Sequence, residues 1–323
     1  MNDSFPAVQD FFIASDGRLR SGWRFAISVV LVILANYLAG ASAYMLAGGH
    51  TRIMEVIFRP LLTILELFAF FILTGVLDRP SISVWQYNGL PRSNWVQESA
   101  MGALLGFVMV GVAVAFIALA FRFSISSLRV TAHTLGVGLA VFGVILAGAM
   151  AEELAFRGYP FQRLVEGGGP FVAILVLSAL FGAVHLQNPH VSDNRSVQVF
   201  AFSNTLLIGI VLAIAYLRTR ALWLPWGLHF GWNATLGLFF GLPVSGISDF
   251  SVLVRSRAIG PEWLLGGAYG IEGGFLGTVI ILLGLLYVLW FVPKKMIEVA
   301  PPAPIAELPQ ESIQADNGAS ADV

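Results

Sequence analysis

Six ionisable or amide side chains stand in stretches of the sequence that are otherwise apolar. They are Glu152, Glu153, Arg157, His185, His229 and Asn233. Carboxylates and imidazoles can take up and release a proton, and amide or imidazole N–H groups can stabilise a developing negative charge. Such groups are costly at membrane depth, so each of them is a functional hypothesis. Together they predict a site that activates water.

The segment AEELAFRG contains a spacing that separates the roles of its two glutamates. In a helix, Glu153 and Arg157 are four residues apart with the acid first, so their side chains can pair on one face. Glu152 points about 100° away around the helix and is left free. A free carboxylate that has lost hydration is suited to act as a general base. A purely structural ion pair at a helix end is the alternative interpretation.

The predicted helices bring these residues to a similar depth. Glu152 and His185 are each about 16 residues from the midpoint of the glycine-rich turn at 167–170, so the two legs of a hairpin place them at one level. His229 and Asn233 are four residues apart and share one face of a later helix. The sequence therefore predicts that five of these side chains converge, namely Glu152, Glu153, His185, His229 and Asn233.

The elements that carry these residues are predicted to be transmembrane helices. Hydrophobic residues make up 57% of the 323 residues and charged residues 11%, whereas charged residues are about a quarter of a soluble protein. Apolar stretches of roughly 17 to 25 residues cross a bilayer. The fold class is therefore all-α, a polytopic transmembrane helical bundle of about eight spans. The predicted spans are 25–47, 60–77, 99–121, 135–158, 170–187, 197–217, 221–240 and 274–292.

The spans divide the chain into six segments. The charged stretch 157–166, between the fourth and fifth spans, is expected to reach water. The segments are a cytoplasmic N-terminal segment at 1–24, N-terminal transmembrane helices at 25–134, core helices with the six polar residues at 135–240, an extracytoplasmic loop at 241–273, a last transmembrane helix at 274–292 and a disordered cytoplasmic tail at 293–323.

An even number of spans places both termini on one side of the membrane. Basic residues number 11 on that side and 7 on the other, which favours cytoplasmic termini in a multi-pass protein of the cell membrane. Arg18, Arg20 and Arg24 before an apolar stretch also fit a signal peptide. An uncleaved first span is preferred, because the apolar run continues to Ala47.

Charge and cysteine content exclude several classes of function. With 18 basic and 19 acidic residues, the chain has a net charge of −1 and lacks the basic surface that nucleic-acid binding needs, so no nucleic acid is expected. The lipid bilayer is the expected partner surface. The chain contains no cysteine, which excludes disulfides, thiolate metal sites and cysteine nucleophiles.

The polar residues stand in a pattern that resembles the CAAX prenyl protease and bacteriocin-processing family of intramembrane proteases. The family pattern is EExxxR, then FxxxH on the next span, then HxxxN two spans later. Here these motifs are EELAFR at 152–157, FGAVH at 181–185 and HFGWN at 229–233. The HLQNP run at 185–189 and the GGAYGIEGG run at 266–274 are looser similarities.

The resemblance implies an endopeptidase that hydrolyses a peptide bond. Glu152 and His185 would activate a water molecule, and His229 and Asn233 would stabilise the oxyanion. The family has been described both as metalloproteases and as metal-independent glutamate proteases, so the expected cofactor is none or a divalent metal such as zinc. If a metal is present, Glu152, His185 and His229 are its candidate ligands.

Two other functions fit the same residues. A proton-coupled carrier also uses acids and histidines at membrane depth, although the sequence shows no internal repeat of the kind found in transporters. A non-catalytic immunity protein could bind a peptide in the same cavity. The expected partner is a peptide or protein substrate, which could be membrane-anchored.

Overall fold

The structure, a computed structural model, describes residues 11–91 and 93–295 and shows a bundle of helices with one small sheet. The predicted tail, apart from residues 293–295, lies outside the described residues. The helices are α2 (Ser21–Ala47), α3 (Thr51–Leu73), α4 (Val84–Tyr87), α5 (Trp95–Ala120), α6 (Ala132–Arg157), α7 (Tyr159–His185), α8 (Arg195–Thr219), α9 (Trp223–Ala234), α10 (Glu262–Leu265) and α11 (Phe275–Phe291). Single π-helical turns extend α3 over Thr74–Asp78 and α9 over Thr235–Phe239.

Within the described residues, five stretches are long and apolar enough to cross a membrane. They are Ser21–Ala47, Ile53–Asp78, Trp95–Ala120, Ala132–His185 and Arg195–Thr219. The fourth of these has 54 residues and contains both α6 and α7, and α11 is a shorter apolar helix. The prediction of an all-α polytopic membrane protein is confirmed, whereas the number of crossings stays a prediction.

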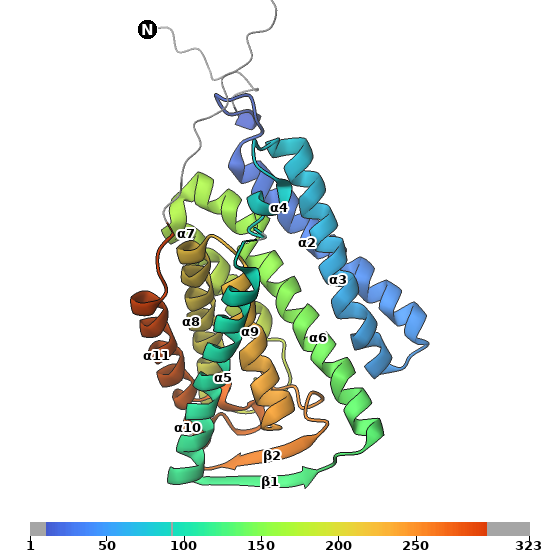
Figure 1. Ribbon diagram of the computed structural model, residues 1–323, viewed down its shortest axis with the longest axis vertical. Helices are drawn as coiled ribbons and strands as arrows, with labels where there is room; N and C mark the ends of the chain where they lie inside the picture. Colours follow the sequence, from blue (N-terminus) through green and yellow to red (C-terminus); the bar gives the residue numbers. More distant parts are fainter. Residues whose placement is uncertain (1–10, 92, 296–323) are drawn as a thin grey trace, which may run out of the picture.

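A two-stranded sheet was not predicted from the sequence. Strand β1 (Arg122–Leu128) follows α5, and β2 (Val254–Ile259) pairs with it in antiparallel orientation. Figure 1 shows the sheet at the end of the molecule away from α4, with α2 and α3 side by side as an outer pair. The segment predicted as a loop at 241–273 therefore contains β2, α10 and two short 3₁₀ turns.

The boundary between α6 and α7 differs from the predicted hairpin. The chain breaks at Gly158, where a Cβ atom would lie 2.4 Å from the Leu154 carbonyl oxygen. Pro160 then starts α7, because proline is compatible with the first turn of a helix. The glycine-rich run is not the turn itself but a kink inside α7, at Gly169 with φ of 82°. Within the stretch 157–166, which is expected to reach water, Arg157 and Arg163 are buried in the protein and Glu166 is exposed.

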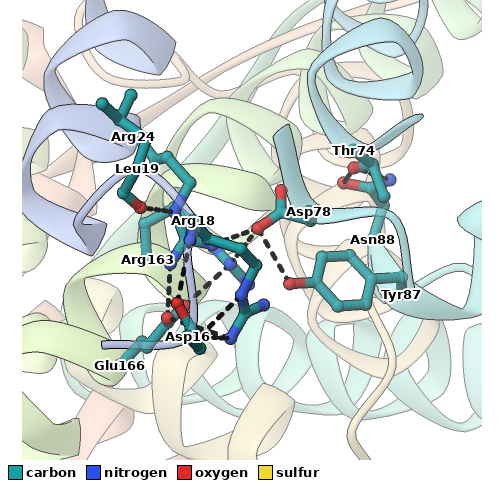
Figure 2. Close-up of polar contacts among 10 residues, drawn as sticks. All are labelled: Asp16, Arg18, Leu19, Arg24, Thr74, Asp78, Tyr87, Asn88, Arg163 and Glu166. Atoms are coloured by element: carbon teal, nitrogen blue, oxygen red, sulfur yellow. Dashed lines mark hydrogen bonds and ion pairs between the residues drawn. The ribbon is translucent and has the colours of Figure 1, made fainter. Parts of the chain in front are cut away.

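Buried charges hold α2, the end of α3 and the start of α7 together. Asp78 accepts a 2.5 Å hydrogen bond from Arg163 Nη1 and pairs with Arg24, which is 1% exposed. Glu166 Oε2 lies 2.8 Å from Arg163 and its other oxygen pairs with Arg24. Figure 2 shows Asp78 facing the two arginines and also the hydroxyl of Tyr87, which donates to it over 3.1 Å. Charges buried in this way are tolerated because each has a partner.

Helices α5 and α9 touch through their backbones. Built Cβ atoms at Gly102 and Gly106 would lie 2.3 Å and 2.5 Å from backbone atoms of α9. Built Cβ atoms at Gly227 and Gly231 of α9 would likewise lie 2.2 Å and 2.4 Å from backbone oxygens of α5. Glycines four residues apart on both helices permit this approach, which membrane helices use to gain van der Waals contact. The contact fixes the position of α9.

Substituting Gly106 with alanine should separate the two helices. We expect Gly106→Ala to lower the free energy of unfolding by about 2 kcal/mol, the cost of overpacking a close contact. Gly111→Ala is the matched control, because it lies on the same helix with no atom within 4 Å of a built Cβ. The control should be neutral or up to about 1 kcal/mol more stable, since alanine favours helix. Thermal unfolding in detergent measures both, and equal effects would contradict the backbone contact.

Candidate active site

One cavity of about 110 Å³ brings together four of the six predicted residues. Glu152 of α6, His185 of α7, and His229 and Asn233 of α9 line it. Its walls also come from α3, α8, α11 and the chain after α9. The remaining two predicted residues, Glu153 and Arg157, are not in the cavity lining but lie buried behind it on α6.

The predicted ion pair is present behind the cavity. Arg157 Nη1 lies 3.2 Å from Glu153 Oε1, and its Nη2 donates to the Gly209 carbonyl of α8 over 3.2 Å. The guanidinium also lies 4.6 Å from the ring centroid of Phe181 on α7. Both charged side chains are at most 1% exposed. Arg157 thus satisfies the buried carboxylate and joins α6 to α7 and α8.

His229 connects the two glutamates. Its Nδ1 lies 2.9 Å from Glu153 Oε1, and its Nε2 lies 3.7 Å from Glu152 Oε2. A hydrogen bond at one ring nitrogen fixes the orientation of an imidazole and determines what the other nitrogen faces. Glu153 therefore turns Nε2 of His229 toward Glu152 and the cavity.

The expectation that Glu152 is left free is wrong. Arg59 Nη1 lies 3.4 Å from Glu152 Oε1, so a cation from α3 stands beside the carboxylate. The long arginine stem passes α6 at Gly148, where a built Cβ would lie 3.3 Å from Arg59 Cδ. Because α3 begins at Thr51, Arg59 lies inside a helix and not in the loop before a span at 60–77. Glu55, four residues earlier on the same face, is a sequence signal for the longer helix.

His185 lies in the cavity at the end of α7. Its Nδ1 is 2.8 Å from the Phe181 carbonyl oxygen one turn earlier, which is the hydrogen bond of a donating Nδ1–H. In that tautomer Nε2 carries a lone pair that can accept a proton. The FxxxH spacing thus places the backbone acceptor that orients the histidine.

The side chains do not form a ready metal site. Among the described residues, no three His, Asp or Glu side chains are grouped closely enough to hold a metal ion. The Nδ1 of His229 is bonded to Glu153, as is usual for a histidine that ligates a metal through Nε2, but the candidate ligand Glu152 has a guanidinium beside it. A catalytic zinc normally has three such ligands at about 2 Å. The arrangement of Glu152, His185 and His229 does not fit that pattern.

Glu272 is a cavity residue that the sequence analysis did not select. It lies in the 3₁₀ turn Ile271–Gly273 before α11, within the GGAYGIEGG run. Its carboxylate accepts hydrogen bonds from Trp232 Nε1 at 2.9 Å and from the Ser245 hydroxyl at 3.1 Å. Burial raises the pKa of Glu272, and the hydrogen bonds from Ser245 and Trp232 oppose that effect. Glu272 could not be identified from the sequence, because it lies among glycines in a segment predicted as a loop, where no helical or strand periodicity marks a buried side chain.

Asn204 and Glu66 are two further polar residues within long apolar helices. Asn204 donates to the Glu272 and Gly274 carbonyl oxygens, each over 2.9 Å, and accepts from Thr278. It therefore makes the interhelical hydrogen bonds expected of a buried amide. Glu66 of α3 is 2% exposed.

A helical membrane protein with acids and histidines facing one internal cavity has the features of an intramembrane hydrolase. Residues 134–235, which run from α6 to the end of α9, match the family described as type II CAAX prenyl endopeptidase Rce1-like. The matched segment contains the three motifs, in agreement with the resemblance noted in the sequence. The family supports a CAAX-type intramembrane endopeptidase acting on a peptide substrate. No curated protein and no solved structure matches the chain.

Removing Arg157 should destabilise the protein more than removing the whole pair. Arg157→Met leaves Glu153 buried without its cation, and we expect a loss of about 3 kcal/mol in the free energy of unfolding. In Glu153→Gln/Arg157→Met, no charge of the pair is left behind, so the loss should be smaller than in the single variant. Chemical or thermal unfolding in detergent measures this. A double variant at least as unstable as the single one would show that the pair is not coupled.

Proposed function

We propose that the protein is an intramembrane endopeptidase and that the cavity between α6, α7 and α9 is its active site. The observation that carries the proposal is the convergence of Glu152, His185, His229 and Asn233 on one cavity. Acids and imidazoles in a small enclosed site are the usual means of activating water, and N–H donors are the usual means of stabilising an oxyanion. The family match supports the same reaction class.

In the proposed reaction, Glu152 is the general base. A water molecule between Glu152 and His185 gives a proton to the carboxylate as its oxygen attacks the carbonyl carbon of the substrate. The carbonyl π electrons move to oxygen, and the resulting oxyanion accepts hydrogen bonds from Asn233 and His229. The proton is then delivered to the amide nitrogen, the C–N bond breaks, and a carboxylic acid and an amine leave. Water is the only co-reactant that this sequence consumes.

Residues behind the cavity serve this reaction by orientation. Glu153 is hydrogen-bonded to Nδ1 of His229, and Arg157 forms an ion pair with Glu153. Arg59 holds one oxygen of Glu152, at 3.4 Å, and leaves the other facing His229. A carboxylate restrained on both sides cannot rotate freely, which keeps the base aimed at one position. Asn233 is the partly exposed amide that completes the site.

The setting of the proposed enzyme is the cell membrane, with both termini in the cytoplasm. The excess of basic residues on the terminal side supports this orientation. We propose a peptide or protein substrate that reaches the cavity beside the lipid bilayer. A substrate anchored in the same membrane fits an active site built among apolar helices.

Loss of the base should abolish cleavage without loss of folding. We expect Glu152→Gln to lower kcat by about 10³-fold for a fluorogenic peptide drawn from a panel of plain and prenylated sequences. Asn233→Ala should lower kcat by about 10²-fold, the effect of one missing oxyanion donor. Glu262→Gln is the control, because Glu262 of α10 accepts a hydrogen bond from Asn194, lies outside the cavity lining and should leave kcat unchanged. The readout is steady-state cleavage by detergent-purified protein.

Two results would contradict parts of this proposal. Normal turnover by Glu152→Gln would rule out Glu152 as the base. The same assay with a chelator tests whether a metal ion takes part. Since Glu152 is proposed to act on water directly, cleavage should resist chelation. Cleavage that is lost on chelation and restored by zinc would assign the activation of water to a metal.

A further inference from the structure

Glu272 joins two parts of the cavity wall that are distant in the sequence. Its Oε1 accepts from the indole N–H of Trp232 on α9, and its Oε2 accepts from the backbone N–H and the hydroxyl of Ser245. Glu272, Trp232 and Ser245 all line the cavity. One carboxylate therefore couples the helix that carries His229 and Asn233 to the segment 243–247.

The segment 243–247 has a backbone that needs support. Ser245 has φ of 46°, in the left-handed region that costs a non-glycine residue about 1–2 kcal/mol. The next residue, Gly246, has φ of 83°, and a built Cβ would lie 2.1 Å from the Pro189 carbonyl oxygen. The Gly246 N–H donates to the Tyr269 carbonyl over 2.8 Å. Strained residues of this kind persist only where surrounding contacts hold them, and they are frequent at ligand-binding sites.

Trp232, which donates to the Glu272 carboxylate, lies next to the proposed oxyanion donors. It lies on α9 between His229 and Asn233, directly before the asparagine, and it is 5% exposed. An indole ring of this size fixes the rotation of its helix when it is packed, and its N–H needs an acceptor when buried. Glu272 is that acceptor, so it helps to set the rotation of α9.

Glu272 is itself held from the backbone side. Asn204 of α8 donates to the Glu272 carbonyl oxygen over 2.9 Å. Unlike Glu152 and Glu153, whose carboxylates lie beside arginines, Glu272 has its carboxylate hydrogen-bonded to neutral donors from two elements. This arrangement suits a residue that fixes geometry.

We propose that Glu272 is a positioning residue of the active site. Its carboxylate keeps the 243–247 segment, which forms part of the wall that meets the substrate, in register with the oxyanion donors on α9. The inference rests on the proposed function, because it assigns to Glu272 a part in binding and orienting the peptide. A substrate would bind to the 243–247 wall and react beside α9, so the two contacts of Glu272 should affect different kinetic constants.

Two variants separate the two contacts. Trp232→Phe removes only the indole contact, and we expect it to lower kcat about 10-fold with little change in KM. Ser245→Pro would distort the backbone, so the contact with the 243–247 segment is tested by Glu272→Gln. A glutamine amide has a single acceptor oxygen and cannot accept hydrogen bonds from both Trp232 and Ser245. We expect Glu272→Gln to raise KM about 10-fold. The matched control is Glu262→Gln. Glu262 is an acid of the same region that accepts a hydrogen bond from Asn194 and does not line the cavity.

A second substitution tests whether the strain at Ser245 is what Glu272 opposes. Glycine adopts a positive φ without the cost that serine incurs. We therefore expect Ser245→Gly in the Glu272→Gln background to bring KM back to within threefold of the wild-type value. A purely structural role would instead lower the melting temperature and the active fraction, leave KM unchanged and give no rescue.

Hydrogen exchange gives a readout that does not depend on catalysis. In detergent-purified Glu272→Gln, amide exchange of the 243–247 segment should rise at least 10-fold, with no such rise in Glu262→Gln. Unchanged exchange of that segment would overturn the inference whether or not any peptide is cleaved. If wild type cleaves and Glu152→Gln does not, while Glu272→Gln keeps its KM, this inference fails and the proposed function stands. If wild type cleaves no peptide, the proposed function fails and the exchange result still decides the coupling.

Discussion

The rest of the site depends on one buried carboxylate, that of Glu153. It is fully buried, and its Oε1 is shared between the Arg157 guanidinium and the Nδ1 atom of His229. Because a buried anion without partners is very costly, α6 and α9 can pack only where both donors reach it. Arg157 extends the same constraint to α8 through the Gly209 carbonyl. The orientation of His229, and with it the geometry of the cavity, follows from the need to satisfy this single charge.

The three motifs and the all-α membrane fold could be predicted from the sequence because they depend on local spacing and composition. The i,i+4 spacing of Glu153 and Arg157 and the apolar runs need no knowledge of distant residues. The partners of Glu152 could not be predicted in this way. Arg59 is 93 residues away from Glu152 in the sequence, and only the packing of α3 across Gly148 brings them together. Glu272 depends likewise on contacts between α9, α11 and the segment before β2.

Several of the basic residues counted for orientation lie inside the helical bundle. A count by side treats every arginine as a solvated loop charge, but Arg24, Arg157 and Arg163 are buried among acids on the terminal side. Arg59, on the other side, is at the cavity. Their main physical role is to neutralise carboxylates inside the bundle. Glycine acts at two places here: Gly158 separates α6 from α7, and Gly169, with φ of 82°, breaks α7 within the run at 167–169.

The backbone contact between α5 and α9 sets a lower limit on the part of the chain that can fold on its own. The segment shared with the endopeptidase family is 134–235, yet α5 spans Trp95–Ala120 and lies outside it. Without α5, the glycine face of α9 would have exposed backbone where its closest neighbour should be. Transplanting the family segment into another helical scaffold would therefore need a partner helix with its own pair of glycines in register. The sequence signature that identifies this enzyme class is thus smaller than the module that evolution or design can exchange.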